Sequence, residues 1–518
     1  MEMSGFSQCT RGRALSSSVR EDGQGTLSPS EAHAGKLTPR SRPLAQRRSR
    51  YSTRLALGAM SLLLALPELV AAQSSVTIPS EYDKVASLRT TVTALGPDLF
   101  GDEVSLYDGT VQFRQVDVSL PGNDNLPVEI ARRFTPRQWP SSKKLFGDWE
   151  LDIPHLEGVF TSGWIVSATP NTTRCTNYKA PPIANGVQGG QFTAVEYWAG
   201  NHLVLSGRKG GGEILKRGAS TPAPNDGQSY PLMTKDGAVF RCLNIGANEF
   251  FEAVTPDGTR YRFDNMVSRP TTQLTKPNPE PELLTAQKQA GGITPLAAID
   301  YFVNRSEVWI LPTVVTDRFG NTVTYNWDST DRWKLLSINA SDGRQLTLTY
   351  VSGTRRIYSV SDGTRQWIYD YSAVSGGEPR LSRVTLPDSS QWTFELQGMR
   401  DVMRETGGGC GATTSDPASG TGTMTHPSGA QGSFAVAATL HGRSYVPSQC
   451  VNGYSYYPAW FATPSLASKT ISGPGISAMS WSYVFAENSC YLPCASGAPA
   501  SKTLTVTGPG GSNALHVR

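Results

Sequence analysis

A degenerate hairpin repeat runs through the middle of this 518-residue chain. Each copy combines a β-branched run, a tight turn that starts at Asp, and an alternating strand that ends in Tyr, Trp or Phe. The turns lie at Asp257-Gly258, Asp317 to Gly320, Asp342-Gly343 and Asp362-Gly363, with a weaker copy at Asp388. A single hairpin cannot bury its own aromatic face, so successive units must pair edge to edge. The sequence therefore predicts an all-β protein built on one extended antiparallel sheet of stacked hairpins.

Composition agrees with a turn-rich β protein. The chain has 51 Gly, 35 Pro and 47 aromatic residues, which suits tight turns and half-buried strands. Hydrophobic residues make up 38% and the mean hydropathy is -0.31, which excludes a polytopic membrane protein. The net charge of +4 comes from residues 1–54, which carry ten basic and four acidic residues. The remainder is close to neutral, so we expect no nucleic-acid partner.

An export signal follows the basic leader. Residues 55–66 are almost entirely apolar, and small residues precede a cleavage site that we place between Ala72 and Gln73. A membrane anchor would need ~20 apolar residues, and Glu68 interrupts this run. The leader is rich in Ser, Gly, Pro and Arg, and we expect it to be disordered. The protein is therefore expected in the periplasm, at the cell surface or outside the cell, and to meet the membrane only during export.

Six cysteines remain after the presequence is removed, and an even number in an exported chain favours disulfides. Their order suggests three local pairs, although fifteen pairings and free thiols stay open. The candidates are Cys175 with Cys242, Cys410 with Cys450, and Cys490 with Cys494. The last pair lacks a second pair of ligands for zinc. We therefore expect no metal site and no cofactor.

The search for catalytic motifs nominates no catalytic residue. The chain has no nucleophile elbow, no His-Glu-x-x-His and no P-loop, and its histidines are scattered. The best carboxylate cluster is Asp148, Glu150 and Asp152, which alternate around Trp149. Such a cluster could serve a secreted hydrolase, but we expect it to form an exposed polar strand face. The protein is therefore not expected to be an enzyme.

The repeats resemble the YD repeats of bacterial Rhs proteins. The similarity rests on residues 317–325, on residues 341–350 and on Tyr369-Asp370-Tyr371. The stretch 98–113 is similar to the segment that precedes these repeats in exported Rhs proteins. The resemblance covers roughly residues 95–400 and identifies the chain with the N-terminal part of an Rhs shell, in truncated form. It implies a β-sheet strip that spirals into a hollow shell around a cargo, often a toxin, which is C-terminal or separately encoded.

Seven segments follow from composition and from this resemblance. They are a basic disordered leader (1–54), a signal h-region with its cleavage site (55–72), an N-terminal β region of Rhs type (73–268), a Pro-rich loop (269–296), YD-like repeats (297–406), a Gly-rich loop (407–433) and further, truncated β repeats (434–518). The last residues read as one strand, a turn and the start of a partner strand. We therefore expect an incomplete shell whose final strand is an unpaired edge.

Three functions are consistent with these observations. The first is a non-catalytic shell or cell-surface structural protein of a polymorphic toxin system. The second is an adhesin that binds cell-surface glycans through exposed aromatic side chains. Its candidate patch is Tyr454, Tyr456, Tyr457 and Trp460. The third is the secreted hydrolase on a β scaffold.

Overall fold

The structure, a computed structural model, describes residues 99–105, 108–122, 126–136, 144–164, 174–187, 189–207, 211–276, 301–374, 377–400, 402, 418–442, 450–451, 454–455, 460–488 and 501–517. Contacts divide the chain into two units, Met1–Tyr82 and Asp83–Arg518, and all of the described residues belong to the second. Strands dominate these residues, and their two helices, α2 (Ala194–Tyr197) and α4 (Gln397–Arg400), are single turns. The prediction of an all-β protein is confirmed. Within the described ranges, no helix is long and apolar enough to cross a membrane.

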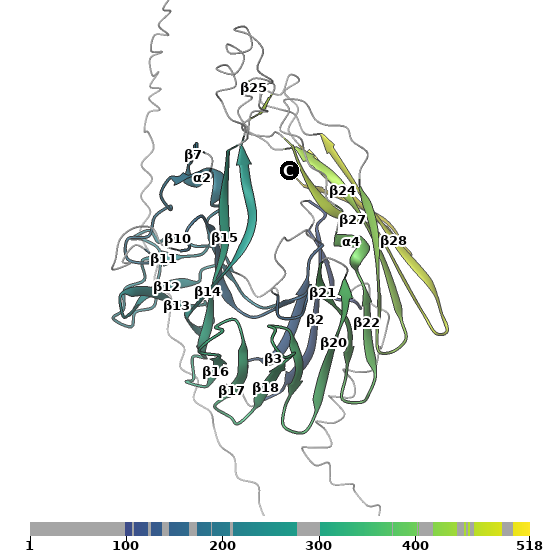
Figure 1. The fold of residues 1–518 in the computed structure, drawn as a ribbon, viewed down its shortest axis with the longest axis horizontal. Coiled ribbons are helices and arrows are strands. Elements are labelled where there is room, and N and C mark those ends of the chain that lie inside the picture. The colour runs from purple at the N-terminus through teal and green to yellow at the C-terminus, as the bar shows by residue number, and fades with distance from the viewer. Residues whose placement is uncertain are drawn as a thin grey trace, which may run out of the picture. The chain divides into compact units, whose positions relative to one another are not determined.

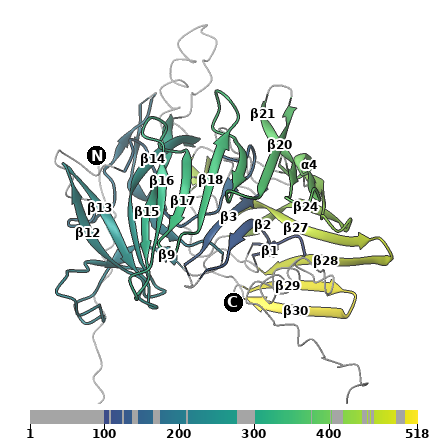
Figure 2. The same ribbon diagram turned by 90° about the horizontal axis from the view of Figure 1, so that it is seen from below.

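The largest sheet of the described residues has 22 strands. From β10 to β24 each strand pairs antiparallel with the next strand in the chain; β24 then pairs with β27, and the run continues to β30 (Figures 1 and 2). This order confirms the predicted extended antiparallel sheet of stacked hairpins. The strands of the run are β10 (Leu215–Lys216), β11 (Leu232–Met233), β12 (Val239–Ile245), β13 (Asn248–Val254), β14 (Arg260–Lys276), β15 (Tyr301–Thr316), β16 (Thr322–Trp327), β17 (Leu335–Ala340), β18 (Gln345–Tyr350), β19 (Ile357–Ser361), β20 (Gln366–Val374), β21 (Gly377–Thr385), β22 (Gln391–Glu395), β23 (Ser419–Thr425), β24 (Gln431–Gly442), β27 (Trp460–Gly473), β28 (Ile476–Asn488), β29 (Ser501–Gly508) and β30 (Gly511–Val517).

The sheet forks at β15, because two different strands share one edge of this long strand. Residues 306–310 pair with β5, whereas residues 314–316 pair with β16. The β5 branch continues through β8 to β9, and the other branch carries the hairpin repeats. The strands of the short branch are β5 (His155–Phe160), β8 (Asn201–Val204) and β9 (Gly211–Glu213).

A separate four-stranded sheet packs against the long one. In Figure 1 its strands β2 and β3 lie between β15 and the β20–β22 region. Its strand β3 contacts β17 and β18, its strand β2 contacts β27, and an isolated bridge joins Thr110 to Ser465. Its members are β1 (Asp102–Val104), β2 (Val111–Leu120), β3 (Val128–Phe134) and β4 (Glu150–Leu151). Two short hairpins complete the described strands: β6 (Ala184–Asn185) with β7 (Gln191–Phe192), and β25 (Cys450–Val451) with β26 (Tyr454–Ser455).

The aromatic residues of the repeats form a shared core with this four-stranded sheet. Phe113 of β2 meets Phe434 of β24 with ring centroids 4.7 Å apart, and Phe146 meets Tyr369 of β20 at 4.8 Å. The repeat aromatics buried in the same cluster are Tyr325, Trp367, Tyr369, Trp392 and Phe394. Burial removes ~150–250 Å² per aromatic residue from water, and at ~25 cal/mol/Å² this stabilises the packing by several kcal/mol per ring before entropy is counted.

Most repeat turns have one backbone pattern. The N–H of the first residue donates to the carbonyl of the fifth, and the N–H of the fourth donates to the carbonyl of the first. This holds for residues 234–238, 255–259, 317–321, 340–344, 386–390 and 426–430. The fourth residue has φ between 68° and 90° in all six turns; it is Ser389 in one of them and Gly in the others. The pattern is a type I turn followed by a left-handed residue, which favours Gly.

Aspartate side chains close these turns. The Oδ1 atoms of Asp257, Asp342 and Asp388 each accept the backbone N–H two residues further on, at 3.0 to 3.2 Å. The turn at Asp362 is one residue shorter, because the Asp362 N–H donates to the carbonyl oxygen of Arg365. Its Oδ1 accepts the N–H groups of both Thr364 and Arg365. An Asp in the turn therefore replaces a backbone acceptor and favours the hairpin over an extended chain.

Two expected loops are partly strand. Strand β14 continues to Lys276, so residues 269–276 of the expected Pro-rich loop belong to the sheet, where Arg269 is buried in ion pairs; residues 277–300 lie outside the described part. The expected Gly-rich loop contains β23 and the start of β24. A Cβ atom at Gly420 would collide with the carbonyl oxygen of Gly398 in α4. Some of these glycines therefore permit close packing of α4 on β23.

Candidate functional site at the contact between the two sheets

Buried carboxylates of the four-stranded sheet face donors of the long sheet. In β1, Asp102 Oδ2 lies 2.5 Å from Lys469 Nζ of β27. In β4, Glu150 Oε2 lies 2.8 Å from Arg269 Nη1 of β14. All four side chains are less than a tenth exposed. Buried charges are tolerated when they are paired in this way, so each pair fixes one position of the small sheet on the large one.

Two further carboxylates of this sheet accept neutral donors. Asp117 of β2 accepts the Tyr369 hydroxyl at 3.1 Å and also binds Arg132 of β3 at 2.9 Å. Asp148, just before β4, accepts the backbone N–H of Leu381 in β21 at 3.0 Å. In the two ion pairs and in the bonds to Tyr369 and Leu381, the acid lies on or next to the small sheet and the donor lies on the long one. Arg132 is the exception, because it belongs to the small sheet itself.

The cluster of Asp148, Glu150 and Asp152 is buried, so the expectation of an exposed polar strand face is wrong. These residues are 4%, 5% and 4% exposed, respectively. The small sheet is covered on both sides here, because Trp149 between them is also fully buried. Each carboxylate has its own partner, and Asp152 binds Arg114 at 2.5 Å. The three groups are thus held separately rather than gathered around a space for substrate.

Burial controls the ionisation of this region. It raises the pKa of Asp148 and lowers the pKa of Lys144, whose Nζ donates to the Asp148 carbonyl oxygen at 3.5 Å. For Arg269 burial acts to lower the pKa, but Glu150 and Glu307 outweigh it and raise the pKa above its ordinary value. Shifted pKa values occur at catalytic sites and also in structural ion-pair networks. The fixed pairing and low exposure suit the second role.

Several contacts between the sheets could not be read from the sequence. The guanidinium of Arg344, in a repeat turn, donates to the carbonyl oxygens of Leu120 and Leu126, both at 3.0 Å. The hydroxyls of Thr463 and Ser465 donate to the carbonyl oxygen of Asp108. These partners are more than 200 residues apart in the chain, so local spacing carries no signal of them.

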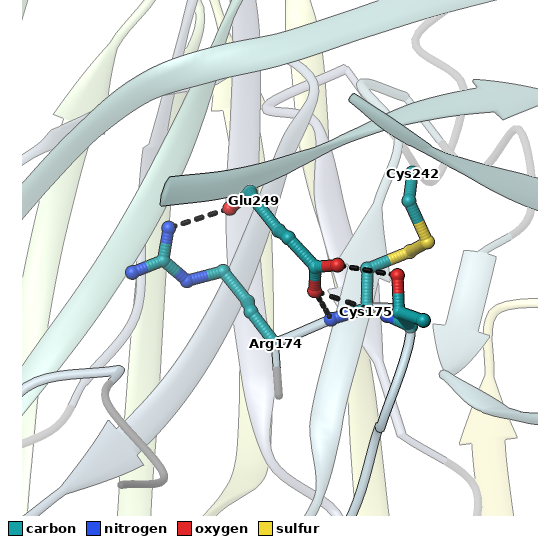
Figure 3. The surroundings of a disulfide bond; sticks show 5 residues. Arg174, Cys175, Cys242 and Glu249 are labelled. Carbon is teal, nitrogen blue, oxygen red and sulfur yellow. Dashed lines mark hydrogen bonds between the residues drawn. A yellow bond between two sulfur atoms is a disulfide. The ribbon is translucent and has the colours of Figure 1, made fainter. Parts of the chain in front are cut away.

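A disulfide and a buried glutamate fasten the segment after Trp164 to β12 and β13 (Figure 3). Cys175 and Cys242 form the first of the expected disulfides, with 5.6 Å between their Cα atoms. Glu249 accepts the N–H groups of Cys175 and Thr176 at 2.8 and 3.0 Å, and Arg174 donates to the Glu249 carbonyl oxygen at 2.6 Å. Burial lowers the pKa of Arg174 to about 10. The bond is compatible with an exported protein.

Other candidate residues lie outside what the structure describes. These are Ala72 and Gln73 of the cleavage site, Cys410, Cys490 and Cys494, and Tyr456 and Tyr457 of the aromatic patch. Cys450, Tyr454 and Trp460 belong to described strands, but their side-chain surroundings are not described. Among the described residues, no group of three or more His, Cys, Asp or Glu side chains is arranged to hold a metal ion.

Comparison with known proteins assigns no family to this chain. No protein family model matches it, and no curated protein matches it. A search of solved structures finds the crystal structure of TcdB2-TccC3-TEV, with 10% identity and a TM-score of 0.13. The match covers 85% of this chain and 25% of that one, so the chain spans about a quarter of its length. A TM-score of 0.13 is too low to indicate a shared fold or function.

Proposed function

We propose that this protein is an exported, non-catalytic structural protein of the YD-repeat type, which forms part of a β wall in a toxin-encapsulating or cell-surface system. The observation that carries the proposal is the unbroken run of sequential hairpins from β16 to β22. Because each repeat adds one hairpin to the edge of the previous one, the sheet widens with every copy. Such a run builds an extended surface, and its formation does not require a catalytic site.

The buried contacts between the sheets support a structural role. Glu150 is paired with Arg269, Asp102 with Lys469, and Asp148 with a backbone amide. These groups are engaged with the protein itself, so they hold the wall on the four-stranded sheet. The natural partner of such a wall is a polypeptide, either C-terminal to it or separately encoded.

The proposal can be tested on the full chain in its native cells. We expect the exported fraction to contain a form that begins at Gln73, which N-terminal sequencing would detect. We expect a second polypeptide, or an extension of this chain, to purify with it and to resist protease. Loss of the ion pair in Arg269→Ala should loosen the wall and expose that polypeptide to protease. In the matched control Arg318→Ala, an exposed turn residue is removed and protection should persist.

Two outcomes would contradict the proposal. One is an exported chain that purifies alone and leaves no second polypeptide protected from protease. The other is hydrolytic turnover by the purified protein that is lost in Glu150→Gln, because this would make the buried carboxylates catalytic rather than structural.

A further inference from the structure

A shallow cavity of about 350 Å³, wide open to solvent, lies on neighbouring strands β14, β15 and β16 and on the turn that follows β16. The strands lie side by side in Figure 1. The cavity is lined by aromatic, acidic, amide and guanidinium side chains: Asp264, Asn265, Tyr325, Trp327, Asp328 and Arg332. Tyr325 is only 6% exposed and also belongs to the core shared by the two sheets. The polar contacts between the sheets described above do not involve Asp264, Asp328 or Arg332, so the wall does not explain why these side chains meet here.

Two irregularities of the sheet meet at this cavity. In the β14–β15 ladder the pairs Phe263–Pro312 and Asn265–Leu311 leave Asp264 out of register. Thr313, which is skipped on the other strand, donates its hydroxyl to Asp264 Oδ1 at 2.6 Å. In the next hairpin the β16–β17 register shifts between Asn326 and Trp327. Bulges redirect side chains and are frequent next to functional sites.

Arg332 is held in a fixed position above the sheet. Its Nε donates to Asn265 Oδ1 at 2.8 Å, and Asn265 Nδ2 donates back to the Arg332 carbonyl oxygen at 2.9 Å. Asn265 is 4% exposed, whereas Arg332 is exposed to solvent. A buried amide that anchors both the main chain and the side chain of an exposed arginine reduces the entropy that the arginine would lose on binding a ligand.

The aromatic wall and one acid are also fixed. The indole N–H of Trp327 donates to the Pro312 carbonyl oxygen at 2.8 Å, so the orientation of the half-buried ring is set. Asp328 Oδ1 accepts the backbone N–H groups of Thr330 and Asp331 at 2.8 and 2.7 Å. These bonds lower the pKa of Asp328, so its carboxylate is ionised at neutral pH.

We propose that this cavity binds one or two rings of a neutral oligosaccharide. Sugars present apolar faces, which pack on aromatic rings, and adjacent hydroxyls, which bind guanidinium, amide and carboxylate groups at once. Two arginines balance the two acids of the site, because Arg262 Nε lies 2.6 Å from Asp264 Oδ2 and Arg332 lines the cavity together with Asp328. This balance of charge favours a neutral ligand over a strongly charged one. The volume falls at the lower end of the range for small-molecule sites.

The test uses the full-length exported protein and defined sugars. The probes are labelled di- to hexasaccharides of glucose, mannose, galactose and N-acetylglucosamine, screened on an array and followed by calorimetry. We expect binding that Arg332→Ala weakens at least ~10-fold, which corresponds to ~1.4 kcal/mol. The control Arg318→Ala removes an exposed arginine from the turn of the neighbouring β15–β16 hairpin and should bind normally. Since Arg332 is exposed, its loss should not unfold the sheet, which the circular dichroism of the variant would check.

Three results would overturn the inference. The first is a folded wild-type protein that binds none of these sugars. The second is equal binding by Arg332→Ala and by the wild type, because the site would then lie elsewhere. The third is selective binding of sulfated or uronic-acid oligosaccharides, because the balanced charges of the site give such anionic ligands no advantage over neutral ones. None of these results bears on a protected polypeptide partner, so the inference stands or falls separately from the proposed wall function.

Discussion

Replacing Ser389 by Gly should stabilise the hairpin formed by β21 and β22. Ser389 occupies the fourth position of its turn with φ of 68°, and it is the only non-Gly residue with positive φ among the described residues. Five turns with the same backbone hydrogen bonds have Gly at this position. The side chain of Ser389 is exposed, and no hydrogen bond from its hydroxyl is found within the described part of the chain. Its removal should therefore cost no contact.

The magnitude follows from two opposing backbone effects. A non-Gly residue in the left-handed region costs ~1–2 kcal/mol. Gly at the same position also destabilises the fold by ~0.4–1 kcal/mol, because the unfolded chain gains conformational freedom. The expected net effect of Ser389→Gly is a stabilisation of about 1 kcal/mol. The reverse change, Gly343→Ser, should destabilise its own hairpin by a similar amount; the space at Gly343 is open, so the cost there is conformational rather than steric.

Native-state hydrogen exchange measures this effect locally. The amides of β21 and β22 should exchange ~5-fold more slowly in Ser389→Gly, as expected for ~1 kcal/mol of opening free energy. Amides of β17 and β18 should exchange faster in Gly343→Ser and remain unchanged in Ser389→Gly. Faster exchange in β21 and β22 of Ser389→Gly would refute the reasoning, since it would mean that the Ser side chain stabilises the turn.

Three further predictions concern the disulfide and the pH dependence. The double change Cys175→Ser and Cys242→Ser should lower the free energy of unfolding by ~4 kcal/mol, the chain-entropy value for a separation of 67 residues. When reductant is added to the wild type, its urea midpoint should fall towards that of the variant. Burial acts to raise the pKa of Asp362, but hydrogen bonds lower it to about 2. Because the unfolded chain binds this proton more tightly, the free energy of unfolding should fall as the pH drops from about 4 to about 2. In Asp362→Asn, the unfolding midpoint should depend less on pH over this range. Burial raises the pKa of Asp148, so its ionised form is disfavoured in the fold; Asp148→Asn should raise the melting temperature at neutral pH, and this gain should vanish as acid protonates the wild-type side chain.

The hairpin wall could be predicted from the sequence because its signals are local. The turn at Asp342-Gly343 and the alternating strand after it lie within ten residues, and that distance is enough to specify a hairpin and the inward position of its aromatic residues. The same reasoning misread Gly420, where glycine looks flexible in the sequence. There the absence of a Cβ serves the packing of α4, which only the structure reveals.

The contacts of the small sheet could not be predicted, because their partners are distant in the chain. From the sequence, Glu150 was expected on an exposed acidic strand face. In the structure it is buried and paired with Arg269 of β14. The cavity at β14 to β16 was also missed, although Asp264-Asn265 interrupts an otherwise regular strand and is a usable signal of a bulge. The hydrogen bond between Arg332 and Asn265, which completes the cavity, could not be predicted, because it depends on the pairing of β14 with β15.

The polar contacts between the sheets determine where the small sheet sits on the long one. A sheet made of aromatic-faced hairpins has no strong preference for where a covering sheet sits, because apolar packing is not directional. Asp102, Asp117 and Glu150 each reach a donor on a different strand, namely β27, β20 and β14. If the small sheet slid by one residue, Asp102 and Glu150 would be left buried without these partners, at a cost of several kcal/mol each. Asp117 would keep Arg132 but lose the Tyr369 hydroxyl. The apolar core therefore supplies the attraction, and the spaced carboxylates select the single position in which β14, β20 and β27 all face the same small sheet.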